Sequence, residues 1–231
     1  MNKRQKKKRR KAWDWTTAAE RKRNKELCHR YPFLIPRSAW TDKITWDEKW
    51  DGHKQKAYSH TLVSEFSKGW WKAFGLMLCE DLRQELLKWN YLNEFRFVQI
   101  KEKFGEIRCY FNSIPLGCKV GEIINDYSHL SENICYFCSK PDVPMTNTGW
   151  YLPICWDCFL KGEIKKNKYR KQPMSLEEIQ NYYEECKCGD GIMSDSRKVI
   201  RYHNGGSEEI TYDLRDKAEK IRARWRCRNG M

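Results

Sequence analysis

Two Cys-x2-Cys pairs constrain the fold of this chain more than any other feature. Cys135-Tyr-Phe-Cys138 and Cys155-Trp-Asp-Cys158 are separated by sixteen residues. Each pair forms a tight knuckle that directs two thiolates at one metal ion, and the segment between them is long enough to bring the knuckles face to face. The spacing predicts one tetrahedral zinc site, with a disulfide or two chance pairs as the alternative. Four thiolate ligands leave no position open for a nucleophilic water, so we expect the zinc to be structural.

Cysteine use and hydropathy favour a soluble protein of a reducing, cytoplasmic compartment. The chain of 231 residues has 11 cysteines, an odd number, and its N-terminal basic run leads into Trp13-Asp14-Trp15 instead of an apolar signal segment. Fully apolar stretches, such as residues 76–79, are too short to span a membrane. Aromatic residues make up 14% of the chain, and they can build a core despite a mean hydropathy of -0.90.

The sequence pattern predicts an α+β fold. Apolar residues recur at spacings of three and four over 69–89, which indicates an amphipathic helix ending near Trp89. Strand-forming residues at 95–100 and 107–111 flank a turn and predict an antiparallel hairpin under that helix. A helix over 121–133 and a zinc module of treble-clef or ribbon type follow. We expect a basic arm and short helix at 1–30, an α+β core at 31–172, and an extension at 173–231 with a helix, a hairpin and a basic C-terminal helix.

The predicted turn Lys101-Glu-Lys-Phe-Gly105 has two interpretations. Gly105 can take a positive φ, which suits a tight hairpin turn. We favour a solvated tip whose Phe104 tucks into the core. The alternative is a partner-binding tip that presents Lys101 and Lys103 beside an aromatic ring.

Three further groups contain residue types that can bind a metal ion or take part in catalysis. Cys186, Cys188, His203 and Cys227 form a possible second metal site, with reduced thiols near a turn as the alternative. Asp51 and His53 suggest acid–base chemistry, but such pairs are common on surfaces. The sequence has no phosphate-binding loop, nucleophile elbow or H-E-x-x-H motif, so we expect no catalytic residues. The remaining four cysteines are expected to be small, buried and unreactive: Cys28, Cys79, Cys109 and Cys118.

Positive charge is concentrated in appendages. The formal net charge is +14, and residues 1–30 hold thirteen Lys and Arg against three acidic residues, a net +10 that leaves +4 for the other 201 residues. Clustered cations with interleaved aromatics favour binding to phosphates and unpaired bases. A solubilising tail, or an arm for an acidic protein, is the alternative. The candidate nucleic-acid-binding residues are Lys3, Arg4, Lys6, Lys7, Lys8, Arg9, Arg10, Lys11, Lys165, Lys166, Lys168, Arg170, Arg222, Arg224 and Arg226.

Several motifs together resemble a recurrent family of uncharacterised bacteriophage and prophage proteins. The shared features are Gly69-Trp70-Trp71, the segment 98–108 (VQIKEKFGEIR), the two cysteine pairs and Gly149-Trp150. Members of that family carry a VKEKFGxLRFY hairpin followed by Cys-x2-Cys, Gly-Trp and a second cysteine pair. The resemblance covers roughly residues 60–160 and implies phage origin, a bacterial cytoplasm and a zinc site. It implies no activity and no catalytic residues.

These observations lead to three functional hypotheses. The first is a phage-encoded, non-enzymatic nucleic-acid-binding protein, with RNA or single strands favoured because no helix-turn-helix is evident. The second is an inhibitor of a host defence machine, of anti-CRISPR or other anti-defence type, that binds a protein or a guide-RNA complex. The third is a nuclease, for which the sequence offers no convincing set of residues.

Overall fold

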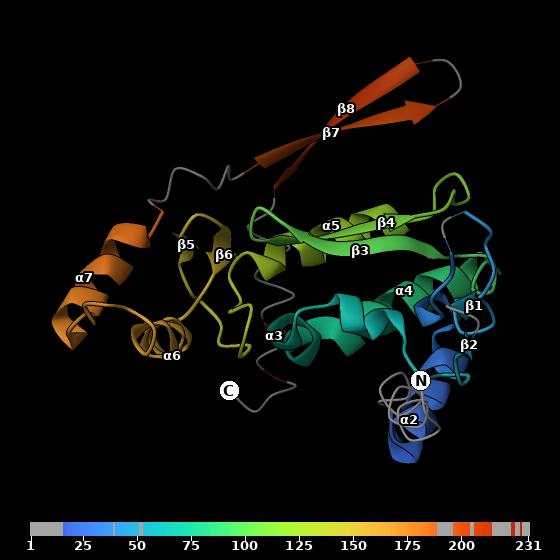
Figure 1. The fold of residues 1–231 in the computed structure, drawn as a ribbon. Coiled ribbons are helices and arrows are strands. Elements are labelled where there is room, and N and C mark those ends of the chain that lie inside the picture. The colour runs from blue at the N-terminus through green and yellow to red at the C-terminus, as the bar shows by residue number, and fades with distance from the viewer. Residues whose placement is uncertain are drawn as a thin grey trace, which may run out of the picture. The chain divides into compact units, whose positions relative to one another are not determined.

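The computed structural model describes residues 16–38, 40–50, 53–188, 196–203, 206–213, 223–224 and 227. Side chains are described in these ranges except at 49–50, 53–54, 196–203 and 206–213. The basic run 3–11, Trp13, Asp51, Arg222 and Arg226 therefore lie outside the described residues. The fold is α+β, as predicted, with each sheet two-stranded in the described part (Figure 1).

Helices and strands follow one another in this order: α2 (Ala18–Arg30), η1 (Pro32–Leu34), β1 (Lys49–Trp50), β2 (His53–Lys54), η2 (Leu62–Glu65), α3 (Lys68–Trp70), η3 (Trp71–Gly75), α4 (Leu76–Lys88), β3 (Phe97–Lys103), β4 (Glu106–Phe111), α5 (Val120–Ser131), β5 (Met145–Asn147), β6 (Tyr151–Pro153), α6 (Trp156–Asn167), α7 (Leu176–Cys186), β7 (Ser196–His203) and β8 (Gly206–Asp213). The predicted basic C-terminal helix is described only at residues 223, 224 and 227, which are helical.

The chain divides into two compact units that interleave along the sequence. The first comprises Met1–Phe66, Cys79–Lys101 and Cys109–Val120, and the second comprises Ser67–Leu78, Glu102–Arg108 and Gly121–Met231. The sequence-based domain boundaries at 30 and 172 remain a prediction.

The first unit has an aromatic core. The ring of Phe33 meets the rings of Phe95 and Phe97 edge to face, with both centroid distances at 5.6 Å. Leu82 and Leu86, from the predicted amphipathic stripe, are fully buried in this unit. Trp89 differs from the prediction, because it lies beyond the end of α4, is 41% exposed and donates its indole N–H to Glu85.

The end of α2 is joined to α4 through one carboxylate in the first unit. Glu80 accepts hydrogen bonds from Gln84 (2.7 Å), Arg30 (2.9 Å) and the Tyr31 hydroxyl (3.0 Å). The hydrogen bond from Gln84, followed by those from Arg30 and Tyr31, lowers the pKa of Glu80 from 4.5 to about 2. The charged form is therefore the one that the fold stabilises.

We expect Glu80→Gln to lower the free energy of unfolding at pH 7 by about 1 kcal/mol, because charge-assisted hydrogen bonds are lost. The pKa of Glu80 is lower in the folded state, so its contribution is complete above pH 4.5 and disappears as the pH falls toward 2. Urea unfolding at pH 7 and at about pH 3 should show the difference from wild type narrowing in acid. Glu26→Gln, at an exposed position on α2, serves as control. An equal difference at both pH values would contradict the assignment.

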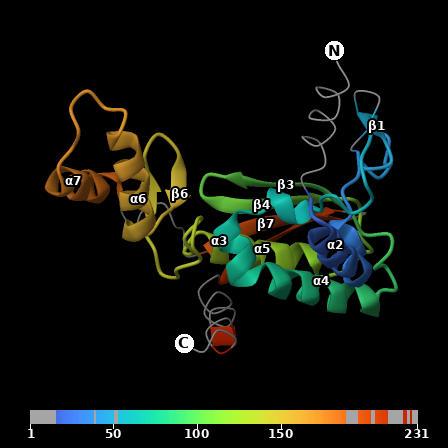
Figure 2. The ribbon, with the colours of Figure 1, turned by 60° about the horizontal axis from the view of Figure 1, so that its bottom comes forward.

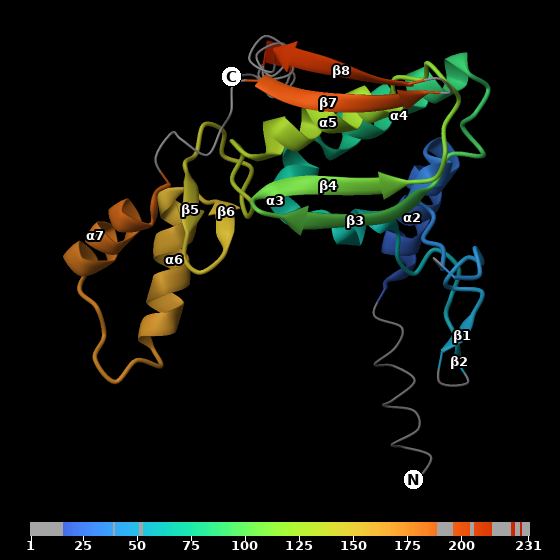
Figure 3. The ribbon, with the colours of Figure 1, turned by 90° about the horizontal axis from the view of Figure 1, so that it is seen from above.

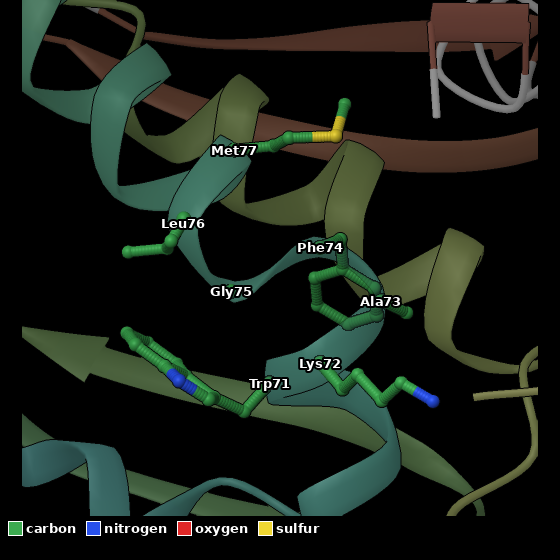
Figure 4. A pocket seen from close by; sticks show the side chains of 7 residues that line it. All are labelled: Trp71, Lys72, Ala73, Phe74, Gly75, Leu76 and Met77. Carbon is green, nitrogen blue, oxygen red and sulfur yellow. The ribbon is translucent and has the colours of Figure 1, made fainter. Parts of the chain in front are cut away.

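The predicted helix 69–89 contains a π-helical turn, η3, which the apolar spacing did not reveal. A Cβ on Gly75 would lie 2.2 Å from the Trp71 ring, so glycine is required for the indole to cover the backbone there. A pocket of about 180 Å³ opens at this turn and is lined by residues 71–77 (Figure 4). Trp71 and Leu76 point to one side of the turn, and Lys72 points to the other (Figure 4).

The predicted β-hairpin is confirmed as β3 and β4, which run antiparallel (Figure 3). The structure corrects the interpretation of its turn, because Phe104 is 67% exposed and does not enter the core. The tip instead places Gly105 against Met145, where an added Cβ would lie 2.4 Å from the methionine sulfur. The close contact at the tip is therefore made by Gly105 and not by the phenylalanine.

Helix α5 packs on the start of β4 within the second unit. The Ser131 hydroxyl accepts the Ile107 amide at 2.9 Å, and the Ser128 hydroxyl donates to the Ile107 carbonyl at 2.8 Å. Tyr127 is buried beside Phe74, with ring centroids 5.5 Å apart. Serine side chains thus satisfy strand backbone groups that have no strand partner on this side.

Candidate metal centre

The structure brings the four predicted cysteines of the two pairs together. The ligand atoms of Cys135, Cys138, Cys155 and Cys158 all lie within 4.8 Å of one another. The sulfurs of Cys138 and Cys155 are 3.5 Å apart, and all four thiols are free. A disulfide needs a sulfur–sulfur distance of about 2.05 Å. The arrangement therefore fits four ligands of one metal ion.

The first knuckle is a turn closed by backbone hydrogen bonds. The Cys135 amide donates to the Lys140 carbonyl at 2.8 Å, and the Ser139 amide donates to the Cys135 carbonyl at 3.2 Å. Ser139 has a φ of 77°, which allows the chain to reverse within so few residues. The Cys135 side chain is buried and Cys138 is exposed, so the centre has one side in the protein and one near solvent.

The second knuckle is built into the beginning of a helix. Cys155 is the N-cap of α6, and the amides of Cys158 and Phe159 donate to its carbonyl at 3.1 and 3.0 Å. The positive end of the helix dipole favours negative charge on the sulfurs there. The Cys155 amide also donates to the Cys135 sulfur at 3.4 Å, which joins the two knuckles directly. The order of knuckle, β5–β6 hairpin and helix-borne knuckle is the treble-clef form of the prediction.

Without a metal ion, the thiols of the centre differ in how readily they ionise. Burial, together with the neighbouring thiols, raises the pKa of Cys155 to about 11 and also raises that of Cys158. Burial opposes ionisation of Cys138 as well, but hydrogen bonds from the Lys140 amide and the other thiols outweigh it and lower its pKa. Four sulfurs so close together repel one another as thiolates unless a metal ion neutralises them.

The beginning of α3 supports the first knuckle from the same unit. The Gly69 amide donates to the Tyr136 carbonyl at 3.0 Å, and the Trp70 indole donates to the Ile134 carbonyl at 3.0 Å. The Trp70 and Tyr136 rings meet edge to face at 5.1 Å. The Gly-Trp-Trp motif is visible in the sequence, but its role is not, because the Trp70 indole bonds to a carbonyl 64 residues away.

Helix α7 supports the second knuckle. Tyr183 donates its hydroxyl to the Ile154 carbonyl at 2.9 Å and packs with Phe159 and Ile179 in one buried cluster. Helices α6 and α7 lie side by side as a result (Figure 1, Figure 2). Beyond α7, the Cys188 amide donates to the Met145 carbonyl at 2.9 Å, so the segment after α7 lies alongside β5.

The possible second site at Cys186, Cys188, His203 and Cys227 is not assembled among the described side chains. Cys186 is buried, Cys188 half-buried and Cys227 exposed, and none of them belongs to a cluster of metal-binding groups in the described part. The side chain of His203 lies outside the described residues. Of the cysteines expected to be unreactive, Cys28 and Cys79 are buried, and Cys109 and Cys118 are half-buried.

A second cluster of titratable groups was not anticipated from the sequence. Ligand atoms of Glu106, His129 and Glu132 lie within 4.8 Å of one another, and the buried Nε2 of His129 has no hydrogen-bond partner among the described residues. The Arg108 guanidinium contacts one carboxylate oxygen of Glu106, and the Ser128 hydroxyl donates to the other at 2.7 Å. Because a cation would have to compete with this guanidinium, we interpret the cluster as a structural one.

The described Lys and Arg candidates differ in whether an acidic side chain of the protein already pairs with them. Lys165 and Lys168 are exposed on or just after α6. Lys166 and Arg170 instead pair with buried Glu163 at 2.7 and 2.8 Å, and Arg170 also bonds to Asn167. Arg224 is helical, whereas the other candidates from the arm and the C-terminus are outside the described residues, as are Asp51 and the side chain of His53.

Comparison with known proteins gives no match: no family model, no curated protein and no solved structure matches this chain. Within the described residues, no helix combines the length and the apolar character needed to cross a bilayer.

Proposed function

We propose that this protein is a phage-encoded, cytoplasmic, non-enzymatic nucleic-acid-binding protein whose core is stabilised by one structural zinc ion. The observation that carries the proposal is the distribution of charge: residues 1–30 supply +10 of the net +14. Such a density of Lys and Arg attracts phosphates, and binding gains from the release of counterions.

Zinc is the metal that best suits the four-cysteine centre. Four zinc–sulfur bonds of about 2.3 Å in a tetrahedron separate the sulfurs by about 3.8 Å. The observed distance of 3.5 Å between the Cys138 and Cys155 sulfurs is close to that value. Soft thiolates favour zinc over magnesium or calcium, and a complete set of four protein ligands is typical of a structural site.

The N-terminal helix α2 extends the basic character of the arm onto an ordered element. A capping box between Thr17 and Glu20 begins the helix, and Thr16 and Asn24 bond to the Ser59 and Tyr58 carbonyls at 2.6 and 2.9 Å. The exposed side chains of α2 include Lys22, Arg23 and Lys25. A ligand held by the arm can therefore also meet a fixed row of cations. Basic contacts of this kind suit RNA or single strands more than base readout in duplex DNA.

Deleting residues 2–15 tests the proposal, because it removes eight Lys and Arg and leaves the capping box of α2 intact. We expect the dissociation constant for single-stranded RNA at low salt to rise about a hundredfold. The slope of log affinity against log salt should become shallower by about 0.7 for each lost phosphate contact. An arm of Gly and Ser with the same length is the control for chain length, and it should bind as weakly as the deletion. Unchanged affinity would overturn the proposal.

The inhibitor hypothesis predicts a different outcome. Pull-down from a nuclease-treated bacterial lysate should retain a protein partner if this chain blocks a host defence machine. If partners are lost after nuclease treatment, nucleic acid mediates the association, as we propose.

A further inference from the structure

Two aromatic side chains are displayed on neighbouring turns of the second unit. Phe104 lies at the β3–β4 turn and is 67% exposed, and Trp150 lies at the β5–β6 turn and is 61% exposed. The two turns are linked, because Glu102 beside the first turn accepts the indole N–H of Trp150 in the second at 2.7 Å. Large exposed aromatics on two linked turns are candidates for recognition of a partner.

The backbone at the first turn is adapted to displaying its ring. Phe104 has a φ of 55° and Gly105 a φ of 83°. The left-handed region suits glycine or asparagine and disfavours a bulky side chain such as phenylalanine. Neither burial nor turn geometry explains phenylalanine at this position, so the strain points to a function for the exposed ring.

One carboxylate joins the Trp150 indole to the backbone of the turn that carries Phe104. Glu102 accepts the Gly105 amide with one oxygen and the Trp150 indole N–H with the other, both at 2.7 Å. The indole is therefore held in place although its faces are exposed to solvent. Both oxygens of Glu102 accept hydrogen bonds from within the protein. A phosphate near the two turns would therefore approach a carboxylate that already has hydrogen-bond partners. Lys103 adds a cation 5.4 Å from the centre of the Phe104 ring.

We propose that Phe104 and Trp150 form a stacking surface for unpaired bases of a single-stranded nucleic acid. This inference rests on the proposed function and adds the place where bases, as distinct from phosphates, are bound. Stacking on a pre-positioned ring requires little loss of side-chain entropy and accepts any base. Lys103 is placed to meet the phosphate beside a stacked base, which favours a nucleic acid over an apolar peptide.

The test uses the full-length protein with oligouridine RNA and with an abasic oligonucleotide of the same length. We expect Phe104→Asn and Trp150→Ala each to weaken binding to oligouridine about tenfold, without changing the salt slope. Asparagine suits the left-handed turn, so Phe104→Asn should keep or raise the unfolding temperature. Trp150→Phe, which keeps a ring but loses the bond to Glu102, should bind more tightly than Trp150→Ala. For the abasic strand, wild type and variants should bind alike.

Trp40→Ala is the matched control, because Trp40 is 95% exposed and belongs to the first unit. It should leave the affinity for oligouridine unchanged. If wild type binds oligouridine and Phe104→Asn binds it equally well, the stacking inference falls while the proposed function stands. If wild type binds neither oligonucleotide, both fall. If the variants lose a protein partner from nuclease-treated lysate at unchanged RNA affinity, the surface binds protein and the inference is overturned.

Discussion

Replacing Cys155 by serine is expected to remove the bound zinc and unfold the cysteine module. Cys155 is one of the four clustered cysteines, is the N-cap of α6 and donates its amide to the Cys135 sulfur. Binding of structural zinc contributes on the order of 10 kcal/mol, which is comparable to the whole stability of a typical domain. Elemental analysis should show zinc falling from about one equivalent to a small fraction. Circular dichroism and limited proteolysis should show loss of α6 and the hairpin before it.

Cys118→Ser provides the matched control for this exchange. Cys118 is half-buried in the first unit and lies outside the four-cysteine cluster, so the variant should retain zinc and its unfolding temperature. Removing the metal from wild type with a chelator should reproduce the effect of Cys155→Ser. Acidification should also release the metal, because the cysteine thiols must be deprotonated to bind it. A Cys155→Ser protein that keeps one equivalent of zinc would refute the assignment of the site.

Local features of the fold could be predicted because their causes are local. The Cys-x2-Cys spacing predicted the centre. The capping boxes at Thr17 and Ser175, where α2 and α7 begin, are equally local, because each is completed by a glutamate three residues later. Alternating apolar residues predicted the β3–β4 hairpin. In each case the interaction that determines the structure lies within a few residues of the signal.

The remaining features depend on contacts between distant parts of the chain. Trp70 bonds to the carbonyl of Ile134, 64 residues away, and Trp150 bonds to Glu102, 48 residues away. The position of Phe104 could not be inferred either, since an aromatic at a turn is normally expected to be buried. In the structure Gly105, and not Phe104, lies against Met145. The π-helical turn at Trp71–Gly75 was likewise not indicated by the apolar spacing of three and four residues.

The second prediction with a large effect concerns Gly69, where α3 lies close to the first knuckle. A Cβ at this position would lie 2.1 Å from the carbonyl oxygen of Cys135 and 2.6 Å from that of Tyr136. Neither oxygen can move freely, because the first accepts the Ser139 amide and the second accepts the Gly69 amide. We therefore expect Gly69→Ala to lower the free energy of unfolding by about 3 kcal/mol or more. It should also speed the loss of zinc to a chelator, because the added methyl group would displace the turn that carries Cys135.

The sign of this effect distinguishes close packing from helix propensity. Alanine is favoured over glycine inside a helix by about 1 kcal/mol, so propensity alone predicts that Gly69→Ala stabilises the protein. Gly162 in α6 provides the contrast, because a Cβ there would have no atom within 4 Å. Gly162→Ala should therefore stabilise the protein by up to about 1 kcal/mol and leave zinc retention unchanged. Urea unfolding of the two variants measures both effects. If both substitutions stabilised the protein, the α3 backbone could not be in close contact with the Cys135 carbonyl. The first knuckle would then keep its conformation without support from the Gly-Trp motif.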